Sequence, residues 1–513
     1  MSAVAGVMSP PETSTRPTTL QALLAGIVPA AAVPAATSTT LSDITLDSRR
    51  VVPGGAFFAL QGTAGHGLDY LPQALAAGAG AVVYEPARGV AAPEGLSVPA
   101  VAVPELRSHL GAIADRWFGA PSARIAVSGV TGTNGKTTVS WLLADALNRL
   151  ERPCAYLGTL GAGMPNVLET ADLTTPDVIE LHRRLAAFAD AGAGHASIEV
   201  SSHALDQGRI DGVRLATAAF TNLSRDHLDY HGSMAAYGEA KARLLDVPGL
   251  EHRVINADDA FGAELCRRHG DSALAVTRRG ATAPRRRIAV GDVCLGADGI
   301  AFSFTSPFGD GSVRSRLRGD FNVENLGVVL GLLLETGIPL DEATAALAAV
   351  EPPPGRLQVV GGGRPLVVVD YAHTPDALAA VLAALRPHCD GELWCVFGCG
   401  GERDPGKRPL MARAAAAADR VVVTSDNPRA EDPATIIAEI MSGAPADGPG
   451  DDKYRVVADR RDAIATAVRE AAPADCVLLA GRGHERFQIT AAGPRPLSDA
   501  AEALAALAGR SSA

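Results

Sequence analysis

The fold of the central part of this chain follows from one glycine-rich motif, Gly129-Val-Thr-Gly132-Thr-Asn-Gly135-Lys136-Thr137-Thr138. An apolar run at residues 124–127 precedes it, and Val139, Leu143 and Leu147 follow it at helical spacing. A glycine-rich turn between a strand and a helix directs backbone N–H groups toward phosphate oxygens, at the positive end of the helix dipole. The sequence therefore predicts a phosphate-binding strand–loop–helix unit. Its predicted nucleotide contacts are Gly132, Thr133, Asn134, Gly135, Lys136, Thr137 and Thr138.

The loop departs from the strict P-loop pattern at Val130, where that pattern has glycine. Lys136 is expected to reach the terminal phosphates of a nucleotide, and the Thr137 hydroxyl is expected to ligate Mg²⁺. A glycine turn with a purely structural purpose would not need the Gly-Lys-Thr-Thr ending. Mononucleotide binding alone leaves a kinase, a GTPase, a motor and a ligase open.

Outward from this loop, the 513 residues are too many for one hydrophobic core. We expect an α/β protein of three domains. A Ser/Thr/Pro-rich tail over residues 1–19 is expected to be disordered. A small α/β domain spans residues 20–120, and a central domain with a P-loop ATPase-like parallel sheet spans residues 121–354. The prolines of Glu351-Pro-Pro-Pro-Gly355 indicate a linker to a third, Rossmann-like domain at residues 355–513.

Short apolar runs separated by helical stretches predict the strands of the outer domains. A short amphipathic helix is expected over Leu20–Ile27. The predicted strands are Gly55–Leu60, Ala81–Tyr84, Val98–Val103, Leu366–Asp370, Leu393–Phe397, Val421–Ser425 and Val477–Ala480.

Composition excludes several classes of protein. The formal net charge of -11 disfavours a general nucleic-acid binder. Seven scattered cysteines, an odd number, disfavour a disulfide scaffold and favour a reducing compartment. No apolar run approaches the roughly 20 residues that span a bilayer. We expect a cytoplasmic monomer with small-molecule substrates, without nucleic-acid partners and without membrane insertion.

Polar residues gather after two further predicted strands of the central domain. Glu199 ends the first, where a carboxylate could bind a metal ion, and His227 follows the second in Thr221-Asn-Leu-Ser-Arg-Asp-His227. Taken singly, Asp and Asn at strand ends are as often structural turn residues. Lys241, taken alone, has the pattern of a helix-surface lysine.

Together, in this order, these motifs resemble the Mur ligase family over nearly the whole chain from about residue 40. The family's loop Gly-Thr-Asn-Gly-Lys-Thr-Thr is present, and Phe-Asn-Val-Glu-Asn, Pro-Gly-Arg-Leu and Val-Asp-Tyr-Ala-His follow it. The resemblance implies that Lys241 is carbamylated by CO₂ to N6-carboxylysine, and that Lys136, Glu199, His227 and Lys241 are catalytic. It implies a metal site of Thr137, Glu199, His227 and Lys241, and an ATP site that also includes Asn322, Asn325, Arg356 and Asp370.

The resemblance also assigns residues to a UDP-linked muramoyl dipeptide. Ser48, in Leu46-Asp-Ser-Arg-Arg, is at the uracil-contacting position, although a hairpin turn also explains this segment. Hydroxyl, amide and guanidinium groups are suited to peptide and carboxylate recognition. The residues implied are Leu46, Ser48, Thr174, Thr175, Ser201, Gln207 and Arg209.

Three motifs of the third domain follow predicted strand ends, where open α/β sheets bind ligands. Asp-Asn-Pro-Arg resembles the form found in family members that add meso-diaminopimelate, and lysine-adding members typically lack the arginine; an Asx turn is the structural alternative. Arg403 and Arg429 are expected to pair with the two carboxylates and Glu485 with an ammonium. The implied set is Arg403, Asp426, Asn427, Pro428, Arg429, Gly481 and Glu485.

The resemblance implies an ADP-forming amide ligase with ATP and Mg²⁺ as cofactors. It would activate a carboxylate of the UDP-linked dipeptide as an acyl phosphate and join it to meso-diaminopimelate. Three alternatives stay open at this point: a lysine-adding Mur ligase, folylpolyglutamate synthase, and a P-loop ATPase without ligase activity.

Overall fold

The computed structural model describes residues 18–33, 40–62, 65–170, 173–280, 285–296, 298–445 and 453–510. They form two compact units. The first comprises the described residues of Met1–Lys136, Glu151–Ile255 and Asp259–Ala273. The second comprises those of Thr137–Leu150, Asn256–Asp258 and Leu274–Ala513.

The first unit begins with a small α/β layer whose four strands are parallel in the order β3-β4-β5-β6. Successive strand residues such as Phe57 and Phe58 are buried on opposite faces of this sheet, against separate hydrophobic clusters. The elements are β1 (Thr18–Thr19), α1 (Leu20–Leu23), β2 (Thr40–Leu41), β3 (Ile44–Thr45), β4 (Ala56–Ala59), α2 (Leu71–Ala76), β5 (Ala81–Tyr84), β6 (Ala100–Ala102) and α3 (Leu106–Trp117).

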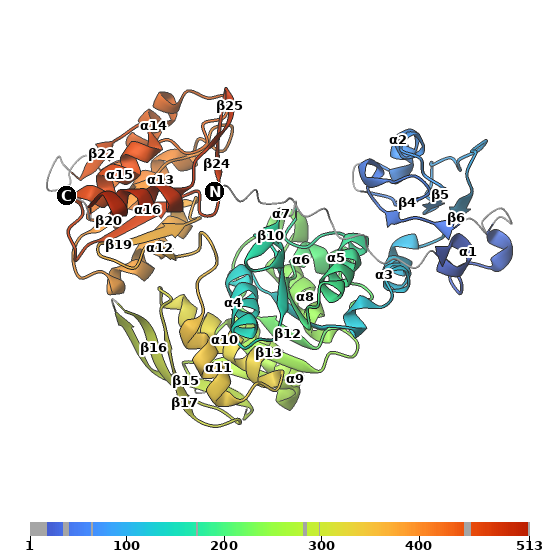
Figure 1. Cartoon of the computed structure of the whole chain (residues 1–513), viewed down its shortest axis with the longest axis horizontal. Helices are drawn as coiled ribbons and strands as arrows, with labels where there is room; N and C mark the ends of the chain where they lie inside the picture. The colour runs from blue at the N-terminus through green and yellow to red at the C-terminus, as the bar shows by residue number, and fades with distance from the viewer. Residues whose placement is uncertain are drawn as a thin grey trace, which may run out of the picture. The chain divides into compact units, whose positions relative to one another are not determined.

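The rest of the first unit contains a larger sheet with strands in the order β10-β9-β8-β11-β7-β12-β13. Figure 1 labels β10, β12 and β13 of these strands. Its inner strands β8, β11, β7, β12 and β13 run parallel, so their carboxyl ends meet at one edge. The elements are β7 (Ala126–Thr131), β8 (Cys154–Gly158), β9 (Gly161–Met164), β10 (Val167–Glu169), α5 (Val178–Asp190), β11 (His195–Glu199), α6 (Ser202–Asp206), β12 (Thr217–Phe220), α7 (Leu228–His231), α8 (Met234–Ala242), β13 (His252–Asn256) and α9 (Ala260–His269).

The second unit contains α4, the strands β14-β15-β16-β17 and a six-stranded sheet of order β18-β19-β23-β20-β21-β22. The elements are α4 (Lys136–Arg149), β14 (Ala273–Thr277), β15 (Arg287–Gly296), β16 (Gly299–Thr305), β17 (Gly311–Ser315), α10 (Phe321–Glu335), α11 (Leu340–Ala349), β18 (Gln358–Val360), β19 (Leu366–Asp370), α12 (Pro375–Leu385), β20 (Leu393–Phe397), α13 (Lys407–Ala415), β21 (Arg420–Val423), α14 (Pro433–Met441), β22 (Tyr454–Val456), α15 (Arg460–Glu470), β23 (Cys476–Ala480), β24 (Phe487–Thr490), β25 (Gly493–Pro496) and α16 (Asp499–Arg510).

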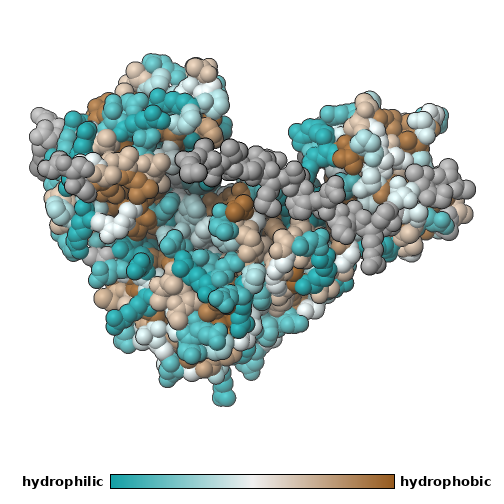
Figure 2. Space-filling model, in the orientation of Figure 1, coloured by the Kyte–Doolittle hydropathy of each residue, from teal (hydrophilic) through white to brown (hydrophobic). Residues whose placement is uncertain are grey.

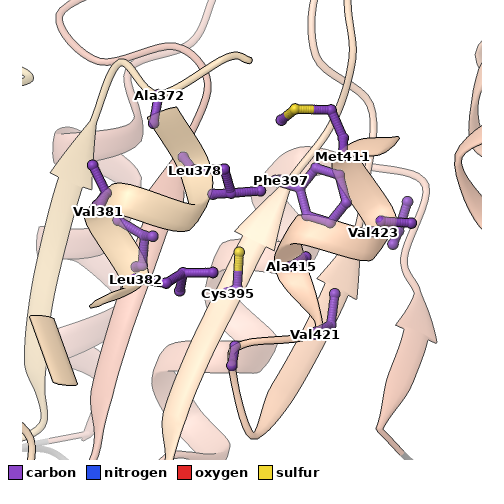
Figure 3. Close-up of a cluster of buried hydrophobic side chains, with 14 of the residues drawn as sticks. Ala372, Leu378, Val381, Leu382, Cys395, Phe397, Met411, Ala415, Val421 and Val423 are labelled. Atoms are coloured by element: carbon purple, nitrogen blue, oxygen red, sulfur yellow. The ribbon is translucent and has the colours of Figure 1, made fainter. Parts of the chain in front are cut away.

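Helices cover both faces of the six-stranded sheet. Cys395 and Phe397 of β20 pack against α12 and α13 on one face, as Figure 3 shows. Trp394 and Val396 pack with α15 on the other face. Strands buried on both faces are expected to be continuously apolar, which explains why the runs Leu366–Asp370 and Leu393–Phe397 are predicted without error.

Several predicted segments differ from the structure in their bounds. The helix expected over Leu20–Ile27 ends at Leu23, because the chain turns there and Gly26 takes a positive φ of 77°. The tail expected to be disordered over residues 1–19 lies outside the described residues except at its end, where Thr18–Thr19 pair with β2. The predicted strand at residues 124–127 begins later and extends to Thr131.

No helix of the described part of the chain is long and apolar enough to cross a membrane. Hydrophobic and hydrophilic residues are interspersed over the face seen in Figure 2. The exposed large hydrophobic side chains of the described residues include Tyr70 and Leu410. All seven cysteines are free thiols, as the odd, scattered pattern predicts.

A buried ion pair joins α15 to α16. The side chains of Arg460 and Asp499 are 0% exposed, and the Nη2 and Oδ2 atoms are 2.6 Å apart. Removing one partner of such a pair costs about 3–5 kcal/mol, because the other charge stays buried. We therefore expect Asp499→Ala to lower the free energy of unfolding by about that amount in chemical denaturation followed by circular dichroism. Asp462→Ala, on the exposed side of α15, is the control, and equal stability of the two variants would contradict the expectation.

Candidate active site

The phosphate loop is held by the segment that follows β12. Gly132 has a φ of 150°, and a Cβ there would lie 1.9 Å from Thr221 Oγ1, so the position requires glycine. Thr221 Oγ1 donates a 2.5 Å hydrogen bond to the Asn134 carbonyl. The Asn134 N–H donates to Asn222 Oδ1 at 3.0 Å, and the Thr133 N–H donates to the Asn222 carbonyl at 2.8 Å. The loop is thus shaped by contacts within the protein.

Two lysines converge on one carbonyl of this loop. Lys136 Nζ donates to the carbonyls of Gly132 and Thr133, at 2.9 Å each. Lys241 Nζ donates to the same Gly132 carbonyl at 2.7 Å and lies 4.5 Å from the centre of the Tyr237 ring. Lys136 begins α4 and Lys241 lies near the end of α8, so only the tertiary fold brings them together.

Burial changes the chemistry of Lys241. Lys241 is only 1% exposed, so the helix-surface position predicted from its local sequence alone is wrong. Desolvation, and next the charge of Lys136, lower the pKa of Lys241 to about 6. At neutral pH the unmodified amine is therefore mostly uncharged, which is the form that can react with CO₂.

Glu199 is buried at the end of β11 and its carboxylate is held from strand β8 and the turn after it. Oε1 accepts hydrogen bonds from the Tyr156 hydroxyl and from the Thr159 N–H, the latter at 2.9 Å. Oε2 accepts from the Thr159 hydroxyl at 3.2 Å. Tyr156 and Thr159 are contributors that the sequence did not reveal, because neither belongs to a motif.

His227 lies among aromatic side chains after β12. It takes a positive φ of 51° at the start of α7, and its side chain is half exposed. Its ring is 4.9 Å from that of His203 and 6.1 Å from that of Tyr237, centre to centre. Tyr237 contacts Lys241 as well, and its hydroxyl is 3.2 Å from Thr133 Oγ1. This tyrosine, which the sequence did not single out, therefore links the predicted metal ligands to the phosphate loop.

The donor groups of the predicted metal ligands suit Mg²⁺ only if Lys241 is carbamylated. Among the described residues, no three His, Cys, Asp or Glu side chains lie close enough together to hold a metal ion. Carbamylation of Lys241 would add an anionic oxygen ligand to Glu199 and His227, and oxygen donors are those that Mg²⁺ prefers. The remaining predicted ligand, Thr137, is the second residue of α4.

The residues predicted to contact the muramoyl dipeptide adjoin Glu199. Thr174 Oγ1 lies 3.1 Å from Thr159 Oγ1. The Thr175 hydroxyl donates to the Glu199 carbonyl at 2.8 Å and accepts from the Ser201 N–H at 3.1 Å. Arg209 Nη1 donates to the Thr175 carbonyl at 2.7 Å. Gln207 joins this group, because its Oε1 accepts from Arg209 Nη2 at 2.7 Å.

The other two residues predicted to contact the UDP-linked dipeptide, Leu46 and Ser48, line a separate cavity of about 760 Å³ in the small N-terminal layer. Ser48 Oγ donates to Gln73 Oε1 at 2.8 Å. His66 and Arg107 also line the cavity. Its size and mixed polar and aromatic lining suit a nucleoside-sized ligand.

Four residues predicted to surround ATP belong to the second unit. Asn325 Nδ2 donates to Asn322 Oδ1 at 2.8 Å, and Asn322 Nδ2 donates to the Arg318 carbonyl at 2.7 Å. The Arg356 guanidinium stacks 5.0 Å above the Tyr371 ring. Asp370 accepts the backbone N–H groups of Leu357 and Ala372, both at 2.8 Å. The contacts of Asp370 thus hold the end of the linker, and desolvation raises its pKa.

Most of the residues predicted to bind diaminopimelate form one connected group. Asn427 Nδ2 donates to Glu485 Oε2 at 2.7 Å, and burial, followed by the charge of Asp426, raises the pKa of Glu485. Gly481 takes a positive φ of 113°, which favours glycine, and a Cβ there would lie 2.8 Å from Asp426 Oδ2. Arg429 Nη1 donates to the Gly401 carbonyl at 2.6 Å.

Arg403 is the exposed member of the predicted diaminopimelate set, and its Nη1 contacts the Glu402 carbonyl at 3.3 Å. Pro428 is buried against Gly401, where a Cβ would lie 2.0 Å from the Pro428 oxygen. The two predicted carboxylate-binding arginines therefore stand on neighbouring loops, one more exposed than the other.

Comparison with known families matches three regions of the chain. Residues 40–118 match the description "Mur ligase family, catalytic domain", residues 130–333 match "Mur ligase middle domain", and residues 355–483 match "Mur ligase, glutamate ligase domain". The α/β fold in three domains is thereby confirmed, while the exact boundaries of the domains stay a prediction.

Similar proteins cover nearly the whole chain. A UDP-N-acetylmuramoyl-L-alanyl-D-glutamate–2,6-diaminopimelate ligase of Alkalilimnicola ehrlichii is 48% identical, over 89% of this chain and 92% of its own. The protein of the same name from Pseudomonas aeruginosa is 48% identical, over 91% of this chain and 95% of its own. A solved structure with that name is 36% identical, with a TM-score of 0.73, and covers 97% of this chain and 100% of its own.

Proposed function

This chain belongs to the Mur ligase family, and we propose that it joins meso-diaminopimelate to UDP-N-acetylmuramoyl-L-alanyl-D-glutamate with ATP as co-substrate. The observation that carries the proposal is the near-complete match to relatives named for this reaction. The convergence of Lys136 and Lys241 on the Gly132 carbonyl of the phosphate loop supports the use of ATP.

The reaction begins with activation of a carboxylate, which is a poor electrophile because its charge is delocalised. A carboxylate oxygen of the dipeptide attacks the γ-phosphorus of ATP, ADP leaves, and an acyl phosphate forms. Lys136 offsets the charge that spreads over the transferring phosphoryl group. Arg209 and the Thr174 hydroxyl orient the dipeptide, while the buried Thr175 hydroxyl binds the backbone of Glu199 and Ser201 beside them.

The second step forms the amide. The uncharged amine of diaminopimelate attacks the acyl carbon through a tetrahedral intermediate, and phosphate leaves while the nitrogen loses a proton. Glu485, whose pKa is raised, pairs with an ammonium of the amino acid, and Arg403 and Arg429 bind its carboxylates. Mg²⁺, held by Thr137, Glu199, His227 and carbamylated Lys241, would supply positive charge next to the phosphates. We place this reaction, carried out by a monomer, in the cytoplasm, where ATP and UDP-linked precursors occur.

The direct test is ADP formation by the purified protein. We expect ADP only when ATP, Mg²⁺, the UDP-linked dipeptide and meso-diaminopimelate are all present, with a product whose mass equals both substrates less one water. ADP released without the amine would favour a P-loop ATPase. Product from a folate and glutamate, or from lysine in preference to diaminopimelate, would favour the other two alternatives.

Lys241→Ala tests the carbamate. We expect kcat to fall about 100-fold, because the variant loses an anionic ligand beside the transferring phosphoryl group, and removal of one electrostatic group of this kind costs about 10²–10³ in rate. Added acetate or formate should partly restore kcat by occupying the vacated space.

Lys453→Ala serves as the control, since Lys453 Nζ donates to the carbonyl of Ala416, which belongs to none of the predicted sites. Near-normal activity of Lys241→Ala, or no rescue by any short carboxylate, would contradict the assigned role. The ligase assignment itself would survive either result.

A further inference from the structure

Two loops of the C-terminal sheet carry the arginines predicted to bind diaminopimelate. The first loop, residues 400–404, contains Arg403, and the second loop, residues 426–431, contains Arg429. The loops contact each other directly: the Gly401 N–H donates to the Asn427 carbonyl at 2.9 Å, and Arg429 Nη1 donates to the Gly401 carbonyl at 2.6 Å. Any group that fixes one loop against the other therefore also fixes the two arginines.

Arg408, near the start of α13, contacts both loops from behind. Its side chain is 2% exposed. Nη2 lies 2.8 Å from Glu431 Oε2, at the end of the second loop, and 3.4 Å from the Gly400 carbonyl, at the start of the first. Nη1 lies 2.6 Å from Glu439 Oε2 in α14. A planar guanidinium with several donors can make these contacts at once, whereas an ammonium cannot match their geometry.

Glu431 completes the link. Its Oε1 accepts the backbone N–H of Glu402, the residue directly before Arg403. Glu402 takes a positive φ of 53°, a strained conformation for a non-glycine residue that persists only when the surroundings hold it. The pKa of Glu431 is lowered, first by the Glu402 N–H and then by Arg408, so the carboxylate form that makes both contacts is favoured.

We infer that Arg408 and Glu431 are positioning residues that set the separation of Arg403 and Arg429, and thereby the enzyme's selectivity for an amino acid with two carboxylates. The inference rests on the proposed function. A substrate with carboxylates at both ends selects for two guanidinium groups at a fixed distance, and binding groups contribute fully only when a supporting layer holds them in place. Arg408 and Glu431 contact the backbone that carries the two arginines and need not touch the substrate.

A purely structural role for Arg408 makes a different prediction. A buried guanidinium needs its carboxylate partners to avoid an uncompensated charge, whichever partners they are. Glu431 and Glu439 both pair with Arg408, but only Glu431 contacts the first loop. The chain therefore offers a matched pair of variants, Glu431→Gln and Glu439→Gln, that separates positioning from charge compensation.

The experiment measures kcat and KM for all three substrates in the full-length protein. For Glu431→Gln we expect KM for meso-diaminopimelate to rise about 10-fold, with KM for ATP and for the UDP-linked dipeptide unchanged. The ratio of kcat/KM for diaminopimelate to kcat/KM for lysine should fall by a similar factor. Glu439→Gln should leave all three KM values within about twofold. Arg408→Lys should behave like Glu431→Gln, because lysine keeps the charge and loses the fork.

Equal KM values for diaminopimelate in Glu431→Gln and Glu439→Gln would overturn the inference, as would a rise in all three KM values together. Either result would leave the proposed function standing if the unmodified protein makes the tripeptide. Failure of the unmodified protein to make it with any amino acid would instead refute the proposed function, and the inference with it.

Discussion

Lys136→Ala is expected to lower kcat about 1,000-fold while leaving the fold intact. Lys136 Nζ contacts the phosphate loop directly, 2.9 Å from the carbonyls of Gly132 and Thr133. Among the described lysines, only Lys241 also contacts this loop, and its side chain is buried. A charge that stabilises the transferring phosphoryl group in a partly buried site is worth far more than in water.

The measurement is ADP formation at saturating substrates, together with circular dichroism and the thermal midpoint. The loop itself should survive, since Thr221 and Asn222 hold it through Asn134. Lys453→Ala, which also removes one positive charge, is again the control. Unchanged turnover in Lys136→Ala would refute the assignment of residues 129–138 as a phosphate loop.

The second large effect is selection against lysine. We expect kcat/KM for meso-diaminopimelate to exceed that for lysine about 1,000-fold. The two amino acids differ by one distal carboxylate, and hydrogen bonds to charged groups contribute roughly 1.5–3 kcal/mol each. Sites that bury the reading group completely discriminate by about 10⁴-fold or more. Arg429 is only half buried, and it keeps its hydrogen bond to the Gly401 carbonyl when lysine is bound. Because lysine would not leave Arg429 wholly unpaired, we expect a preference of about 1,000-fold and not 10⁴-fold.

Arg429→Ala should remove most of this selectivity by raising KM for diaminopimelate, with little effect on the weak activity toward lysine. Arg413→Ala, an exposed arginine of α13, is the matched control. Comparable kcat/KM values for the two amino acids in the unmodified protein would refute the role of Arg429. The acyl-phosphate mechanism would not be affected.

The sequence predicts the strands well where both faces of a strand are buried. The doubly covered strands β19 and β20 are continuous apolar runs, and their bounds are predicted without error. The linker at residues 351–355 contains neither helix nor strand, as consecutive prolines require. Prediction is poorer at the N-terminal end, where the helix expected over Leu20–Ile27 is stopped by a turn that local apolar periodicity does not encode.

The phosphate loop, the order of the motifs and therefore the family can be recognised without a structure, because glycine, lysine and threonine at fixed spacing encode a local backbone shape. The burial of Lys241, the Gly132 carbonyl that it shares with Lys136, and the contacts of Arg408 with the two arginine-bearing loops are visible only in the folded protein. These properties depend on contacts between residues far apart in the chain. Desolvation and charge proximity arise only when folding brings such residues together, so no local pattern records them.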